Sequence, residues 1–164
     1  MSEKKKILFV GGSNGALEIV KIAYKFNQMF PNVIIFVITG FRYYETYQFN
    51  QNARVYKKIN NISSIFNRFD LIVSRAGAST IAEILATNSV AVLFPSKNVS
   101  ANHQVKNAQY LKNLAAVEMI LNLDDESVQT IYSLLNDEEK RKLIKSNSNA
   151  IFLKDSLNEL RKVV

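Results

Sequence analysis

Apolar and polar positions along the chain divide it into two kinds of segment. Short apolar runs are typical of strands in a parallel sheet; they cover residues 7–10, 33–39, 71–74, 90–94 and 117–121. Residues 54–59 alternate in polarity, which predicts a further strand. Longer segments with helical spacing of apolar residues separate or follow them; they cover residues 16–30, 60–69, 79–87, 103–114, 124–135, 137–148 and 153–164. This alternation predicts an α/β fold with a doubly wound parallel sheet. The tyrosine-rich residues 41–52 predict a short helix or loop.

The stretch from Asp70 to Asn107 carries most of the candidate chemistry. It reads as a strand, a turn of small residues around Gly77, a helix and a second strand, which is a βαβ crossover. Such a unit directs the first turn of its helix beyond the carboxyl ends of the strands, where open parallel sheets bind ligands. The unpaired N–H groups of that turn carry partial positive charge, so this site is expected to attract a phosphate.

Polar side chains in the same helix leave two interpretations open. Ser79 and Thr80 would add hydroxyl donors to the anion site, and Glu83, one turn on, could accept hydrogen bonds from a ribose. The alternative is a capping arrangement, with Ser79 or Thr80 as the N-cap and Glu83 as its partner. Spacing alone favours the capping arrangement slightly.

A second glycine-rich turn follows the first strand. Residues 11–15, GGSNG, lie between a strand and a helix, where a loop can approach phosphate or sugar. The spacing matches neither GxGxxG nor a P-loop, so a tight strand-to-helix turn is the alternative.

Composition narrows the class of protein. The 164 residues suit one domain, and the absence of cysteine excludes disulfides and cysteine metal sites. A single histidine, His103, argues against a multi-histidine metal centre. The net charge of +7 favours an anionic partner such as a nucleotide, nucleic acid or acidic membrane, although lysines solvated on the surface would also produce it. No membrane span or signal peptide is visible, so a cytoplasmic chain is expected.

Three motifs in order carry a family resemblance: GGSNGA at 11–16, DLIVSRAGASTIAE at 70–83 and PSKNVSANHQVKNA at 95–108. They resemble the MurG family of glycosyltransferase family 28, whose members add N-acetylglucosamine to the lipid-linked muramyl-pentapeptide of peptidoglycan synthesis. The resemblance covers nearly the whole chain, but only the carboxyl-terminal half of the family's enzymes. It departs from the family at residues 88–90, which form a turn before a strand.

The resemblance implies the Rossmann-like, carboxyl-terminal half of a GT-B glycosyltransferase. Residues 1–164 would be a single domain that binds the donor UDP-N-acetylglucosamine, with the acceptor-binding amino-terminal domain absent. The implied partners are therefore UDP-N-acetylglucosamine, an acceptor-binding domain or subunit, and a lipid-linked acceptor reached through that partner, with no nucleic acid. The implied setting is cell-wall biogenesis, cell shape and the cell cycle, in the cytoplasm and peripherally on the inner face of the membrane.

The resemblance also implies roles for individual residues. Ser13 would approach the donor phosphate or sugar, the backbone of Ile59 would recognise uracil, and Glu83 would hold the ribose hydroxyls. Gln104 would bind the sugar hydroxyls, and Asn107 would support that turn. The helix N-terminus facing the diphosphate would consist of Ala78, Ser79, Thr80 and Ile81.

No cofactor, metal or catalytic residue is assigned to this chain by the resemblance. His103 is expected to pack or cap its helix, and Arg75 either braces its turn or binds the ligand. The alternatives to a transferase half are a non-catalytic nucleotide-sugar binding module and an Alg13-like subunit of a two-chain transferase.

Overall fold

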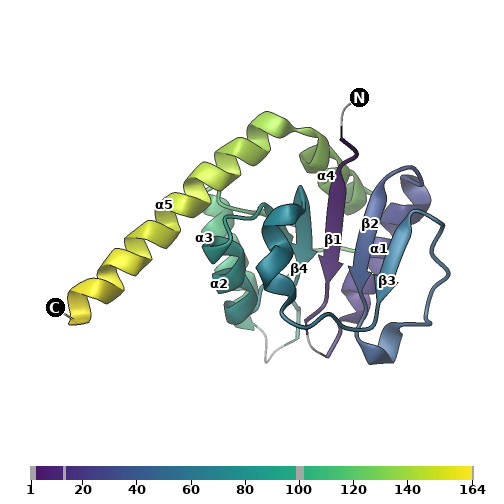
Figure 1. Cartoon of the computed structure of the whole chain (residues 1–164), viewed down its shortest axis with the longest axis horizontal. Coiled ribbons are helices and arrows are strands. Elements are labelled where there is room, and N and C mark those ends of the chain that lie inside the picture. Colours follow the sequence, from purple (N-terminus) through teal and green to yellow (C-terminus); the bar gives the residue numbers. More distant parts are fainter. Residues whose placement is uncertain (1–2, 13, 99–101, 164) are drawn as a thin grey trace.

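The structure is a computed structural model that describes residues 3–12, 14–98 and 102–163. Six parallel strands form one sheet in the order β3-β2-β1-β4-β5-β6 (Figure 1). The strands are β1 (Lys6–Val10), β2 (Ile34–Ile38), β3 (Ala53–Tyr56), β4 (Leu71–Ser74), β5 (Ala91–Leu93) and β6 (Glu118–Met119). The predicted doubly wound α/β fold is confirmed.

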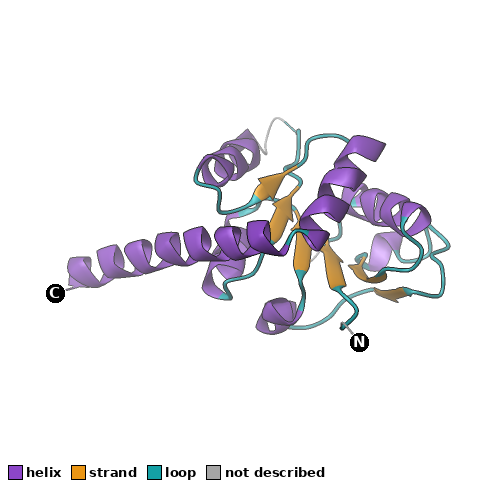
Figure 2. Ribbon diagram, turned by 90° about the horizontal axis from the view of Figure 1, so that it is seen from above, coloured by secondary structure: helices purple, strands orange, loops and turns teal. Residues whose placement is uncertain are grey.

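Helices cover both faces of this sheet (Figure 2). The α-helices are α1 (Leu17–Met29), α2 (Ala78–Ala86), α3 (Asn102–Asn113), α4 (Asp125–Asn136) and α5 (Glu138–Val163). Two 3₁₀ helices complete the described elements, η1 (Phe41–Tyr43) and η2 (Ile62–Arg68). The first lies in the tyrosine-rich stretch, where a short helix or loop was expected.

The core has two layers because successive strand residues point to opposite faces of the sheet. In β1, Ile7 and Phe9 join a cluster with residues of α1 and α4, whereas Leu8 and Val10 join a cluster with residues of η2, α2 and α3. The central strands β1, β4 and β5 are therefore buried on both sides, which explains their continuous apolar runs, whereas residues of the edge strand β3 alternate between half-buried and exposed.

The carboxyl-terminal region differs from the prediction. Residues 137–148 and 153–164 were expected to form two helices, but the structure has one continuous helix, α5. Neither glycine nor proline occurs in it, so nothing forces the backbone to end a helix there. Ile144 packs in the first core cluster and Ile151 against the second, so core contacts continue through the expected break.

Acidic caps begin the last two helices. Asp124 is the N-cap of α4 and accepts a hydrogen bond from the backbone N–H of Ser127 at 2.8 Å. The backbone N–H of Lys140 donates to Asp137 at 2.9 Å at the start of α5. Both caps lie at the residues where the sequence predicts these helices to begin, 124 and 137.

The turn after β1 packs against the end of β2. Gly15 and Gly40 have φ of 75° and 74°, and a Cβ on Gly15 would lie 2.4 Å from the carbonyl oxygen of Thr39. Gly15 therefore serves a tight turn that no larger residue could make. In the described part of the chain, no helix has the length and apolar character needed to span a bilayer.

Candidate functional site

A cavity of about 410 Å³ lies at the carboxyl edge of the sheet. Val10 and Ile38, the last residues of β1 and β2, form part of its wall, as does Arg75, which directly follows β4. The chain order reverses between β1 and β4, and open α/β sheets bind ligands at such a switch point. The volume falls within the ~300–1,000 Å³ typical of ligand pockets.

The cavity wall combines cations, hydroxyls and one carboxylate. Apart from the strand ends, it is lined by Gly12, Lys57, Lys58, Ile59, Asn61, Ile62, Ser63, Phe66, Gly77, Ser79, Thr80 and Glu83. The three cationic side chains outnumber the single carboxylate, Glu83, so the cavity favours a ligand with negative charge. The Nζ of Lys57 also lies 4.9 Å from the centre of the Tyr44 ring.

The N-terminus of α2 opens into this cavity. The N-cap is Gly77, which makes no side-chain hydrogen bond, and the helix starts at Ala78. Ser79 and Thr80 are thus inside the first turn, and the capping interpretation with either of them as N-cap is wrong. Since no side chain caps the helix, the first backbone N–H groups are left for another partner.

Gly77 leaves the approach to that helix end open. Its φ of −69° suits any residue, so its backbone does not require glycine. A Cβ built on Gly77 would meet no atom within 4 Å, so no packing contact requires glycine either. The missing side chain instead widens the space through which an anion could reach the helix.

Arg75 braces the turn below the cavity. Its Nη2 lies 2.5 Å from Oε2 of Glu18 on α1, and its Nη1 donates to the carbonyl oxygen of Phe94 at 3.2 Å. Burial lowers the pKa of the guanidinium, and the charge of Glu18 acts in the opposite direction. The guanidinium still carries its charge at neutral pH because its ordinary pKa is far above 7. Arg75 is therefore a bracing residue whose charge also reaches the cavity.

The structure brings four of the predicted donor residues together. Ile59, Ser79, Thr80 and Glu83 all line the cavity, although they come from segments on opposite sides of the switch point. Ala78 is exposed at the first position of α2. Ile81 packs against the second core cluster, so its side chain supports the helix instead of lining the cavity.

The remaining predicted residues lie apart from this wall. Gln104 and Asn107 are half-buried on α3, and Oε1 of Gln104 accepts a hydrogen bond from the backbone N–H of Ser96 at 3.0 Å. Gln104 therefore holds the segment that follows β5. His103 is exposed in the first turn of α3, so the expectation that it packs is wrong. The prediction for Ser13 lies outside the described residues.

Sequence reasoning missed the two lysines of the cavity. Lys57 and Lys58 directly follow β3, at the same edge of the sheet as Gly12 and Arg75. The third strand was predicted to run over residues 54–59, which placed both lysines inside it, whereas β3 ends at Tyr56 and leaves them at the carboxyl edge of the sheet.

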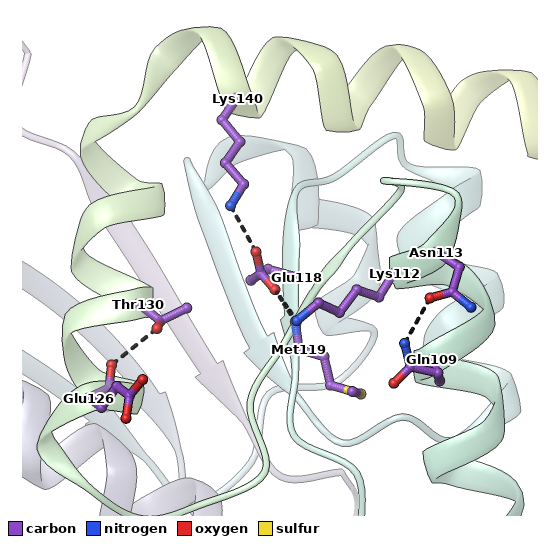
Figure 3. A network of polar contacts seen from close by, with 8 residues as sticks. All are labelled: Gln109, Lys112, Asn113, Glu118, Met119, Glu126, Thr130 and Lys140. Carbon is purple, nitrogen blue, oxygen red and sulfur yellow. Dashed lines mark hydrogen bonds and ion pairs between the residues drawn. The ribbon is translucent and has the colours of Figure 1, made fainter.

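A separate polar cluster around β6 is structural (Figure 3). The Glu118 carboxylate forms ion pairs with the Nζ of Lys112 on α3 at 3.0 Å and with the Nζ of Lys140 on α5 at 2.8 Å. Burial by itself would raise the pKa of Glu118, but hydrogen bonds from Lys140, the Met119 N–H and Lys112 hold it below its ordinary value. Among the described residues, no group of three or more acidic or histidine side chains is arranged to hold a metal ion.

Fold and cavity together define a Rossmann-like domain with an anion-attracting site at its switch point. The sequence matches the family profile described as "Glycosyltransferase family 28 C-terminal domain" over residues 6–160. The chain therefore belongs to the glycosyltransferase family 28 C-terminal domain family.

Two curated relatives share the name "UDP-N-acetylglucosamine--N-acetylmuramyl-(pentapeptide) pyrophosphoryl-undecaprenol N-acetylglucosamine transferase". The protein from Oenococcus oeni is 37% identical over 141 residues, covering 78% of this chain and 37% of that protein. The protein from Flavobacterium psychrophilum is 31% identical over 174 residues, covering 99% of this chain and 47% of that protein. The chain thus spans less than half the length of these relatives.

Solved structures show the same fold. The crystal structure of MurG from Acinetobacter baumannii has a TM-score of 0.74 at 22% identity, covering 90% of this chain and 48% of that chain. The calicheamicin glycosyltransferase CalG4 has a TM-score of 0.71 at 13% identity, covering 98% of this chain and 43% of that chain. The chain has the architecture of the carboxyl-terminal half of GT-B glycosyltransferases.

Proposed function

We propose that this chain is the donor-binding half of a hexosyltransferase and that its donor is UDP-N-acetylglucosamine. The observation that carries the proposal is the cavity at the switch point, where the uncapped N-terminus of α2, Glu83 and Ile59 meet. The relatives from Oenococcus oeni and Flavobacterium psychrophilum are both named as transferases of N-acetylglucosamine from this nucleotide sugar.

Each part of UDP has a fitting group in the cavity. The first N–H groups of α2, with the hydroxyls of Ser79 and Thr80, would bind the diphosphate, and Lys57 and Lys58 add positive charge. Glu83 would accept hydrogen bonds from the ribose hydroxyls, and the backbone of Ile59 would recognise the uracil edge. Ala78 and Ile81 would contribute backbone groups to the same helix end.

The sugar would lie toward the segment after β5. Gln104 already contacts this segment through its carbonyl oxygen, which leaves its amide group to donate to a sugar hydroxyl. Asn107, one turn later on α3, would support that position, and Ser13 would approach the phosphate or sugar from the glycine-rich turn.

The residues of this chain would promote departure of UDP. Negative charge develops on the diphosphate as the bond to the sugar breaks, and fixed N–H groups together with the α2 dipole stabilise that charge. The attacking hydroxyl would come from a lipid-linked muramyl acceptor held by an acceptor-binding domain or subunit. Such a protein would act in the cytoplasm, peripherally on the membrane, in peptidoglycan synthesis.

The far half of α5 supports the presence of such a partner. Figure 1 shows this helix extending well beyond the sheet. Leu153 and Leu157 on it are 52% and 56% exposed, and Phe152 is 37% exposed. Apolar side chains on a helix that has left its own core are suited to packing against another domain, and the curated relatives are more than twice as long as the matched region.

Thermal unfolding with nucleotides tests the donor proposal. A ligand that binds only the folded state raises its stability, by about 2.7 kcal/mol at a hundredfold excess over Kd. UDP and UDP-N-acetylglucosamine should raise Tm at millimolar concentration, while ADP at the same concentration should raise it less. Equal rises in Tm with ADP and UDP would contradict recognition of uracil. No rise in Tm with either nucleotide would refute the donor site.

A transfer assay tests the activity. The 164-residue chain alone should transfer no labelled N-acetylglucosamine to a lipid-linked muramyl acceptor, because transfer needs a positioned hydroxyl and a base about 3 Å from it. Addition of an acceptor-binding domain, covalently or in trans, should restore transfer. Binding of UDP-N-acetylglucosamine without transfer in either arrangement would favour a non-catalytic module. Turnover by the chain alone would contradict the proposal that transfer requires an acceptor-binding domain or subunit.

A further inference from the structure

A second cavity lies at the opposite edge of the sheet from the donor cavity. It has a volume of about 460 Å³ and is bordered by Lys6, the first residue of β1, and by Asp70, which directly precedes β4. The end of η2 and the first two turns of α5 complete its wall. A ligand in this cavity would therefore be separated from the donor site by the length of the strands.

Cationic side chains dominate the wall of this basic cavity. Seven lysine and arginine residues face only three carboxylates, Glu3, Asp70 and Glu138. The seven come from the amino-terminal segment, η2 and α5, so the concentration of charge is produced by the fold and not by one run of sequence. Cationic side chains held this close repel one another, and a bound anion would relieve that repulsion.

The three carboxylates are already engaged. Asp70 accepts a hydrogen bond from the backbone N–H of Lys6 at 2.7 Å. Glu3 pairs with the Lys6 side chain at 3.4 Å, and Glu138 pairs with Lys142 at 3.1 Å. These contacts use two of the cations and all the acidic groups of the wall.

One further cation has a structural role. Arg141 is buried and donates to the carbonyl oxygens of Leu134 and Leu135 at the end of α4. Four cations then remain without an ion-pair partner among the described residues: Lys4, Lys5, Arg68 and Lys145. Hydrogen bonding from Lys142 lowers the pKa of Glu138, and the charges of Lys142, Lys5 and Arg141 act in the same direction.

From this arrangement we infer that the basic cavity is a second anion site, which binds a phosphate-bearing ligand. Lysine and arginine side chains around an open hollow match phosphate oxygens, which accept several charge-assisted hydrogen bonds at once. The phosphate could belong to a soluble molecule or to the headgroup of an anionic lipid. The inference does not depend on the donor site, since none of the described residues lines both cavities.

Amide NMR with inorganic pyrophosphate locates the binding. Titration of the whole chain at low salt should shift resonances of Lys5, Arg68 and Asp70, in addition to any shifts at Ser79 and Thr80 in the donor cavity. High salt should weaken the effect at the basic cavity, because exposed charges are screened. Shifts confined to the donor cavity would overturn the inference while leaving the donor site intact.

A charge-matched pair of variants tests the residues. K5Q/R68Q/K145Q removes three cations from the basic cavity, and K21Q/K154Q/R161Q removes three from positions that line neither cavity. The first should weaken pyrophosphate binding at the basic cavity by about tenfold or more, and the second by about twofold at most. Equal losses would show that net charge alone attracts the anion and would overturn the inference. If the triple variant fails to fold, the single reversal K145E should still weaken binding.

Vesicle sedimentation distinguishes the two sources of phosphate. Vesicles of phosphatidylglycerol and phosphatidylcholine in equal parts should retain the wild-type chain and the control variant more strongly than K5Q/R68Q/K145Q if the phosphate is a lipid headgroup. Pyrophosphate binding that depends on the same three residues, without vesicle binding, assigns the cavity to a soluble phosphate. Dependence on these residues in neither assay would refute the site.

Discussion

The surroundings of Glu83 exclude one of its two interpretations, the capping arrangement, and leave ribose binding as a prediction. Spacing alone favoured a capping role, but Gly77 is the N-cap and makes no side-chain hydrogen bond. The Glu83 carboxylate lines the donor cavity and has no ion-pair partner in the part of the chain that the structure describes. An exposed carboxylate beside a cationic helix end is placed to bind hydroxyl groups of a ligand whose phosphates occupy that end.

Substitution of Glu83 should therefore affect affinity and not folding. Glu83→Ala should weaken UDP and UDP-N-acetylglucosamine alike, by about tenfold, because a hydrogen bond to a charged group is worth about 1.5–3 kcal/mol. The free energy of unfolding should change by about 0.5 kcal/mol or less, as for other exposed positions. Calorimetric titration measures the affinities, with Asp155→Ala as a control for lost charge. Unchanged affinity would exclude the ribose role.

Gln104 should discriminate between the two ligands. Gln104→Ala should weaken UDP-N-acetylglucosamine more than UDP, because the proposed contact is to the sugar. The same change removes the acceptor for the Ser96 N–H, so Gln104→Glu, which keeps that oxygen, serves as the matched variant. Selective loss of the sugar nucleotide in both variants supports the sugar contact. Equal loss for both ligands, measured by the same titration, would refute it.

At the scale of elements, α2 combines a short apolar face with an N-terminus that no side chain caps. Ile84 is buried in the second core cluster and Ile81 packs against it, so the helix is fixed to the sheet by its inner side. Its first turn lies beyond β4, and Gly77 leaves the access open. The helix is thus held rigidly while its charged end remains available, as a preorganised anion site requires.

Gly77→Ser should weaken UDP binding without lowering the free energy of unfolding. A serine hydroxyl can cap α2, and the backbone at position 77 suits serine, so stability should be unchanged or rise by about 0.3 kcal/mol. The added side chain should also narrow the approach to the helix and compete for its N–H groups, which weakens UDP. Urea unfolding and UDP titration of one preparation measure both effects. A stable variant with undiminished UDP affinity would contradict phosphate binding at this helix end.

Glu118 connects three elements and should give folding a dependence on pH. Its pKa is lowered in the folded state, so its contribution to stability is complete above the ordinary glutamate pKa of ~4.3 and is lost as pH falls through the lower folded value. Glu118→Gln should cost about 1 kcal/mol at pH 7. The difference from wild type should shrink below about pH 4. Urea unfolding across pH tests this, with the exposed Glu139→Gln as control. A difference independent of pH would contradict the ion-pair role.

At the scale of the whole molecule, the sequence predicted the sheet and its helices because buried parallel strands leave uninterrupted apolar runs. Four residues predicted to bind the donor line one cavity: Ser79, Thr80 and Glu83 from the motif at 70–83, and Ile59, which lies in none of the three motifs. Lys57 and Lys58 were missed because the third strand was predicted to continue to residue 59, whereas β3 ends at Tyr56. The two helices predicted at 137–148 and 153–164 form one helix, α5, in which Ile151 packs against the second core cluster, a tertiary contact that local spacing does not reveal.

The two cavities lie at opposite edges of one sheet. The donor cavity takes its chemistry from strand ends and the start of α2, whereas the basic cavity takes its charge from strand beginnings and the start of α5. Only the first of them lies at the switch point, where the nucleotide of a sugar donor would bind.

Titration of the ¹⁵N-labelled chain with UDP is the sharpest test of nucleotide binding at the switch point. Saturable shifts are expected at the amides of Lys58, Ile59, Gly77, Ser79, Thr80 and Glu83, because ring currents and hydrogen bonds of a bound nucleotide act on the groups that contact it. UDP-N-acetylglucosamine should shift the same amides and, in addition, that of Gln104. Absence of saturable shifts at millimolar UDP, or shifts that cluster away from the start of α2, would contradict nucleotide binding in this cavity.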